Sequence, residues 1–230
     1  MLDMEGMKMN SKKILISEIS AILFVLLIIL VRTVDVAPIG PAGTAIGLSG
    51  INGAVAKALG FHNFLYKLTD LLGYLALLMG GLLALKGLKQ LIERKKLFAV
   101  DANILISGVL YAVTIALYFF FDKVAVNFRP VLMEGELVPE ASFPSSHTVL
   151  ACVMFASHFI LAEDLVRDDG LRKKVRIVLA ALLGITVLGR FFSGAHWFTD
   201  IIAGLLLSTS LISLYSAALD LPGSSYKPKH

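Results

Sequence analysis

The chain has 230 residues, is 57% hydrophobic, has a mean hydropathy of +0.81 and carries a formal net charge of +4. This composition is typical of an integral membrane protein, because a soluble domain of this length would show shorter apolar segments with a charged face. The modest charge gives no sign of nucleic-acid binding. The single cysteine, Cys152, excludes an intramolecular disulfide and disfavours a thiolate metal site.

Apolar segments of nearly 20 residues recur along the chain, and this length is sufficient to cross the hydrocarbon core of a bilayer. The first segment follows a basic stretch, as in a signal peptide, but its long apolar core and the lack of a small-residue cleavage site favour a retained helix. Residues 36–66 begin rich in Gly and Pro and predict a loop with a short interfacial helix. The sequence thus predicts an all-α, polytopic membrane protein, one membrane-embedded domain over residues 1–230, with six transmembrane helices at about 14–34, 68–85, 102–121, 146–161, 177–192 and 198–217.

The distribution of positive charge predicts the orientation, because Lys and Arg favour the cytoplasmic side. Of the 21 Lys and Arg residues, 15 fall in the two terminal tails and in the connections after the second and fourth spans. The opposite face holds only Arg32, Lys57, Lys67, Lys123, Arg129 and Arg190. Both termini are therefore predicted to be cytoplasmic, in a multi-pass protein of the cell membrane.

Polar residues that flank the spans are predicted to meet at the extracytoplasmic face. Ionisable residues at the ends of membrane segments are costly, which makes them candidates for a functional site. Four segment ends contribute them: Lys123, Arg129, His147, Arg190, His196 and Asp200.

His196 and Asp200 lie four residues apart at the start of the sixth span, so their side chains share one helical face. A carboxylate there can hold an imidazole in one tautomer and stabilise its protonated form. Considered alone, the two residues are explained more simply as a helix-capping pair at the membrane interface.

Arginine and serine residues near the two histidines indicate an anion site. Arg129 and Arg190 each offer a planar fork of donors that matches phosphate oxygens, although arginines at span ends commonly extend toward the interface. Ser145, Ser146 and His147 open the fourth span, where free backbone N–H groups and the helix dipole favour negative charge. Serines at this position also serve as ordinary N-caps.

In combination, these residues fit phosphoryl transfer, which mainly needs positioning and neutralisation of charge on the phosphate oxygens. Two arginines, Lys123, serine hydroxyls and helix amides supply this without a metal ion, and two histidines allow one nucleophile and one general acid. Glu134, Glu136 and Glu140 have no metal-ligand spacing and predict a solvated loop, or a lid over the site. No metal and no cofactor are therefore expected.

Three short motifs carry a resemblance to a known family. They are Arg129-Pro130, then the run Pro144-Ser145-Ser146-His147, then Arg190 with His196 and Asp200 at fixed spacing. Each motif is weak alone, but the ordered set on one membrane face resembles the signature of the type-2 phosphatidic acid phosphatase family. The resemblance implies a metal-independent lipid phosphatase.

The resemblance also implies a role for each candidate. His196 would attack phosphorus and form a phosphohistidine, Asp200 would orient His196, and His147 would protonate the leaving oxygen. The phosphate would be held by Lys123, Arg129, Ser145, Ser146 and Arg190.

The chain departs from the family pattern at three positions. Asp122 stands where the family usually has lysine, and Lys123 follows one residue later, where a helix end could still present it to the site. Ser146 stands where glycine is usual, and Gly189 stands where serine is usual.

Family analogy and topology make undecaprenyl diphosphate the first expected substrate, with phosphatidylglycerol phosphate or phosphatidic acid as the alternative. The expected partners are this lipid phosphate and the bilayer, without an obligatory protein partner. A non-catalytic protein that binds or transports anionic lipid is the rival of another class, and it would be expected to contain broken helices. His158 lies too far along the fourth span for the site and is predicted to be a hydrogen-bonded interior residue.

Overall fold

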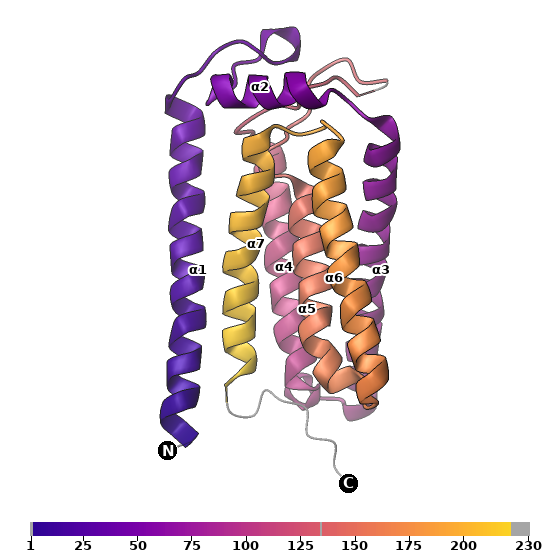
Figure 1. Ribbon diagram of the computed structural model, residues 1–230. Helices are drawn as coiled ribbons and strands as arrows, with labels where there is room; N and C mark the ends of the chain where they lie inside the picture. Colours follow the sequence, from indigo (N-terminus) through magenta and orange to yellow (C-terminus); the bar gives the residue numbers. More distant parts are fainter. Residues whose placement is uncertain (1, 134, 222–230) are drawn as a thin grey trace.

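The computed structural model describes residues 2–133 and 135–221, with side chains described from Asn10 onward. Within these ranges the chain is helical, and β-structure is limited to two isolated bridges. The elements, in order along the chain (Figure 1), are α1 (Leu2–Thr33), η1 (Pro41–Gly43), α2 (Ser49–Leu59), α3 (Asn63–Arg94), η2 (Leu97–Ala99), α4 (Ala102–Lys123), α5 (Ser146–Leu165), α6 (Asp169–Phe192) and α7 (Phe198–Leu219).

Six of these helices, α1 and α3 to α7, are long and apolar enough to cross a membrane, which confirms the predicted six-span all-α fold. Several helices extend beyond the predicted spans. The span predicted at 68–85 lies inside α3, and the span predicted at 177–192 is the second part of α6. Lys, Arg, Gln and Glu are good helix formers, so a helix continues past its apolar core into the polar interface.

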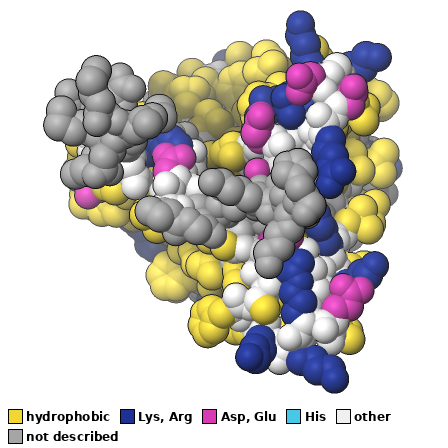
Figure 2. Space-filling model, turned by 90° about the horizontal axis from the view of Figure 1, so that it is seen from below, with side chains coloured by type: hydrophobic (Ala, Val, Ile, Leu, Met, Phe, Trp, Pro, Cys, Tyr) yellow, Lys and Arg dark blue, Asp and Glu magenta, His cyan; other side chains and the backbone are white. Residues whose placement is uncertain are grey.

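The first predicted span belongs to α1, and the short helix predicted in the loop after it is α2. This helix lies across one end of the bundle (Figure 1), which we call the α2 end. At the opposite end, which we call the termini end, α1 begins and α7 finishes. Basic side chains gather on the termini end (Figure 2), where the connections between α3 and α4 and between α5 and α6 lie.

Helix α5 is the centre of the bundle and contacts α3, α4, α6 and α7, whereas α1 packs mainly on α7. The α5–α7 contact is close because Gly204 faces Thr148, and a Cβ on Gly204 would lie 2.9 Å from the Thr148 Cβ. This contact holds the first turn of α5 against the second turn of α7, and the backbone N–H of Ser145 donates to the carbonyl of Asp200 at 3.0 Å. The two helix starts that carry the predicted histidines are therefore fixed beside each other.

Helix α2 is anchored to the start of α7 by a buried side chain. The Asn52 Nδ2 donates to Thr199 Oγ1 at 3.0 Å, and the Thr199 backbone N–H donates to Asn52 Oδ1 at 3.2 Å. The turn between α6 and α7 is held from the other side, because a Cβ on Gly194, which has a φ of +67°, would lie 1.7 Å from the Gly60 carbonyl oxygen. Only glycine fits there.

Candidate active site

A cavity of about 650 Å³ lies near the α2 end and is bounded by α3, α4, α5 and the segments that precede α5 and α7. One part of its wall is polar and is formed by Asp70, Arg129, Glu140, Ser146, His147 and His196. The other part is apolar and comes mainly from α3 and α4, through Tyr74, Leu77, Ile115, Leu117, Tyr118 and Phe121. A charged group and an attached apolar chain can therefore lie in one continuous space.

His196 lies in the turn before α7 and is only 6% exposed. Its Nδ1 lies 3.1 Å from the carbonyl oxygen of Ser142. Because a carbonyl only accepts, this contact places the ring proton on Nδ1 and leaves a lone pair on Nε2. The Nε2 atom is buried without a hydrogen-bond partner, and the residue lines the cavity. This is the arrangement that a nucleophilic imidazole requires.

Asp200, in the first turn of α7, lies close to His196 but does not form a hydrogen bond with the imidazole. Its Oδ2 is 3.6 Å from His196 Nδ1, which exceeds hydrogen-bonding distance. Instead, Oδ2 accepts from the backbone N–H of Trp197 at 3.1 Å, and Oδ1 accepts from Asn127 Nδ2 at 3.3 Å. In this structure, therefore, the Ser142 carbonyl orients His196, while the carboxylate holds the turn that carries it.

The pKa of His196 lies well below its ordinary value. Burial is the main cause, because it penalises the charged imidazolium, and the positive charges of Arg129 and Arg190 lower the pKa further. The low pKa keeps the imidazole neutral, and therefore nucleophilic, below neutral pH.

Carbethoxylation of His196 by diethyl pyrocarbonate, followed by peptide mass spectrometry, is expected to show this low pKa. The rate of carbethoxylation rises with pH because only the neutral ring reacts. The pH at which this rate is half of its maximum, the half-point, should fall below about 6.5, the pKa of an unperturbed histidine. Arg129→Gln should move the half-point upward, because Arg129 is the largest electrostatic cause of the shift. A half-point at or above that of a histidine model compound would contradict the burial argument.

Arg190, near the end of α6, is fully buried and contacts two neighbouring helices, α3 and α5. Its Nη2 donates to His147 Nδ1 at 2.8 Å, and its Nη1 donates to Thr69 Oγ1 and to Asp70 Oδ1, both at 3.0 Å. The guanidinium also lies 4.6 Å from the centre of the Tyr66 ring. Arg190 Nε has no hydrogen-bond partner, and the residue lies behind those that line the cavity.

Arg129 comes from the connection between α4 and α5 and lies on the same side of the cavity. Its Nε is 2.7 Å from Glu140 Oε2, and its backbone N–H donates to the Glu140 carbonyl at 2.9 Å. Its Nη1 is buried and unpartnered. Glu140 thus contacts the site rather than standing free in the loop, whereas Glu134 lies outside the described residues.

Of the remaining phosphate-binding candidates, one lines the cavity and two do not. Ser146 lines the cavity. Ser145 is buried as the N-cap of α5, where its Oγ accepts from the Thr148 backbone N–H and hydroxyl. The Lys123 side chain is 81% exposed, pairs with Asp122 at 3.2 Å and does not line the cavity.

Several residues of the site were not among the sequence candidates. The sequence does not mark Asn127, Ser142 or Tyr66 as functional, because such polar and aromatic residues are common in connections and at helix ends. It does mark Asp70, since this residue is a carboxylate inside the apolar run of α3. His158, in contrast, lies as predicted, buried in α5 with its Nδ1 2.8 Å from the Met154 carbonyl.

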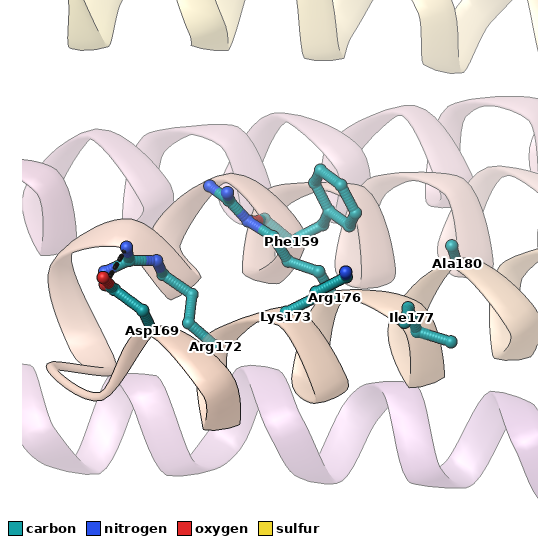
Figure 3. A pocket seen from close by; sticks show the side chains of 7 residues that line it. All are labelled: Phe159, Asp169, Arg172, Lys173, Arg176, Ile177 and Ala180. Carbon is teal, nitrogen blue, oxygen red and sulfur yellow. Dashed lines mark hydrogen bonds and ion pairs between the residues drawn. The ribbon is translucent and has the colours of Figure 1, made fainter.

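A second hollow of about 390 Å³ lies between α5 and α6 toward the termini end (Figure 3). Its arginines already have acidic partners: Arg172 is paired with Asp169, and Arg176 lies 2.9 Å from Glu163. His147 is twelve residues from Phe159 of this hollow along α5, about 18 Å at the rise of an α-helix. This hollow is therefore separate from the site.

Within residues 10–133 and 135–221, no three His, Cys, Asp or Glu side chains converge in a way that could hold a metal ion. The polar wall instead supplies cationic donors and two imidazoles. Six spanning helices around such a wall define a membrane-embedded protein that acts on an anionic group joined to an apolar chain.

The comparisons with known proteins identify the family. The family model for the PAP2 superfamily matches residues 71–221, and the chain belongs to this family, the type-2 phosphatidic acid phosphatases. It is accordingly a membrane-embedded hydrolase that acts on phosphate esters of lipids. No curated protein is similar enough in sequence to count as a match.

A solved structure shows the same fold. It is described as the crystal structure of the first transmembrane PAP2 type phosphatidylglycerolphosphate phosphatase from Bacillus subtilis. The match has a TM-score of 0.58 and 19% sequence identity, and it covers 87% of this chain and 93% of that chain.

Proposed function

We propose that this protein removes phosphate from a lipid phosphate or diphosphate through a phosphohistidine on His196, without a metal ion. The observation that carries the proposal is a group of three buried nitrogens without partners, namely His196 Nε2, Arg129 Nη1 and Arg190 Nε. Unsatisfied buried donors and acceptors are costly, so a site that retains them is suited to a ligand that supplies the missing partners. A phosphate offers oxygens to both guanidinium groups and a phosphorus atom to the lone pair.

The reaction proceeds in two balanced steps. In the first, His196 Nε2 attacks phosphorus, a P–N bond forms, and the bond to the leaving oxygen breaks as the imidazolium form of His147 donates a proton to that oxygen and becomes neutral. In the second, water attacks the phosphohistidine and passes a proton to His147, which releases phosphate and restores both histidines. Arg129 and Arg190 neutralise the charge that develops on the phosphate oxygens.

Undecaprenyl diphosphate is our first choice of substrate, and phosphatidylglycerol phosphate or phosphatidic acid is the alternative. The apolar wall from α3 and α4 supports a substrate whose chain stays in the bilayer. The basic connections at the termini end support a cytoplasmic location for that end, and thus a site that faces out of the cell. The similarity of fold to a phosphatidylglycerolphosphate phosphatase is the observation that favours the alternative.

Phosphate release from a panel of these lipids tests the proposal. The purified protein in detergent with EDTA is expected to release phosphate from at least one of undecaprenyl diphosphate, phosphatidylglycerol phosphate and phosphatidic acid, at a rate that added Mg²⁺ does not increase. The highest kcat/KM identifies the substrate. Binding of all three without release would favour the non-catalytic alternative, although the unbroken spanning helices of the described chain oppose a transporter with discontinuous helices. A rate that EDTA abolishes would contradict the metal-free mechanism.

A further inference from the structure

Asp70 on α3 touches two of the residues that carry the proposed chemistry. Its Oδ1 lies 3.0 Å from His147 Nε2 and 3.0 Å from Arg190 Nη1, and its side chain is 27% exposed in the wall of the cavity. The match to the family begins one residue later, at residue 71. Building on the proposed function, we propose that Asp70 is a positioning residue that holds His147 as the acid for the leaving group.

The hydrogen bonds around His147 fix the position of its proton. Arg190 has only donors, so its contact of 2.8 Å requires a lone pair on His147 Nδ1. The proton of the neutral imidazole is therefore on Nε2, which donates a hydrogen bond to the Asp70 carboxylate at 3.0 Å. Without Asp70, this tautomer would lose the acceptor that orients the ring.

Packing brings Asp70 to this position. One turn farther along α3, Gly73 faces the same imidazole, and a Cβ there would lie 2.9 Å from His147 Cδ2. The missing side chain lets α3 approach α5 closely enough for the carboxylate, three residues earlier on the same face, to reach Nε2. Asp70 and Gly73 thus act together in placing the ring.

Charge gives Asp70 a second effect on His147. Arg190 from α6, Arg129 from the α4–α5 connection and His196 from the turn before α7 all face His147 or lie close to it, and none is an anion. Among the described residues, Asp70 is the carboxylate in contact with the ring. It therefore offsets the neighbouring cations and favours positive charge on the ring, which must gain a second proton at Nδ1, in place of the Arg190 hydrogen bond, before it can act as an acid.

The contact of Asp70 with Arg190 suggests a different role, in which the carboxylate only positions the arginine for phosphate. The two roles differ in how they depend on the leaving group. A leaving-group acid matters for an alkoxide, which leaves poorly without a proton, and matters little for a nitrophenolate. Loss of phosphate binding affects both substrates equally.

The experiment compares Asp70→Asn with wild type on an alkyl phosphate and on a nitrophenyl phosphate that carries an alkyl chain of the same length. Both are assayed with the full-length protein in detergent. We expect kcat for the alkyl phosphate to fall about 10–100-fold, because the variant keeps only part of the rate enhancement that a general acid provides. The kcat for the nitrophenyl phosphate should fall far less. The basic limb of the alkyl phosphate pH profile should also move to lower pH. Asp70→Glu, which keeps the carboxylate, should retain the wild-type ratio between the two substrates.

Asp169→Asn is the matched control, since it removes the carboxylate of another Asp–Arg pair on α6 at the termini end. It should leave both rates unchanged. Equal losses on the two substrates in Asp70→Asn, or no loss on either, would overturn the assigned role. Failure of wild type to hydrolyse either phosphate would instead count against the proposed function itself.

Discussion

Replacing His196 by alanine is expected to lower phosphate release at least ~10⁴-fold, the scale seen when a covalent nucleophile is removed. The reason is that His196 Nε2 is the buried, unpartnered nitrogen on the cavity wall, whereas the lone pair of His147 Nδ1 already accepts a hydrogen bond from Arg190. The measurement is phosphate release from the best lipid of the panel, together with the thermal unfolding temperature to show that the variant folds.

Trapping of the intermediate separates His196 from other histidines. Wild type quenched during turnover of a ³²P-labelled lipid should carry an alkali-stable label on the peptide that contains His196, and His196→Ala should carry none. His62→Gln is the matched control, because His62 is exposed and does not line the cavity. Turnover by His196→Ala close to the wild-type rate would refute the assigned nucleophile.

Replacing Arg190 by glutamine is expected to reduce both activity and stability. Loss of one cationic donor to the transition state typically costs about 10²–10³-fold in rate. The Asp70 carboxylate would lose its charged partner, and because it is partly exposed we expect the free energy of unfolding to fall by about 1–3 kcal/mol, less than for a fully buried pair. kcat/KM and thermal unfolding in detergent measure the two effects.

The double variant Arg190→Gln, Asp70→Asn distinguishes the two effects. Removing the carboxylate that was left without its partner should restore most of the lost stability, whereas activity should remain low because the phosphate still lacks its arginine. Arg172→Gln on the same helix is the control, since its partner Asp169 lies at the surface, where a pair typically contributes less than about 1 kcal/mol. Recovery of activity in the double variant would show that Arg190 serves only to neutralise Asp70.

The sequence predicted the six spans and that several candidate residues would lie close together, because both depend on local patterns. Spans follow from the length of apolar segments, and the candidates His147, Arg190, His196 and Asp200 stood out as costly polar residues at span ends. Their convergence in one place followed from the alternation of spans across the membrane. The structure places them together near the α2 end.

The prediction was less accurate where contacts depend on the path of the backbone. Lys123 was expected near the phosphate, but the last turn of α4 directs it toward solvent beside Asp122. Ser145 was assigned a phosphate contact, yet its hydroxyl caps α5. Asp200 was expected to bind His196, and a spacing of four residues does bring them close, but the Ser142 carbonyl from a separate segment takes the hydrogen bond to the ring.

By itself, the amino-acid sequence determined the fold class and the lipid phosphatase class and singled out the two histidines as candidates, because hydrophobic length and the cost of charge in a bilayer are properties of local composition. Only the tertiary structure decided which partner each histidine has. Ser142 reaches His196 through the connection between α4 and α5, and Asp70 reaches His147 because Gly73 allows α3 to approach α5. Such contacts join residues that are far apart in the chain, so they follow from packing and cannot be inferred from spacing.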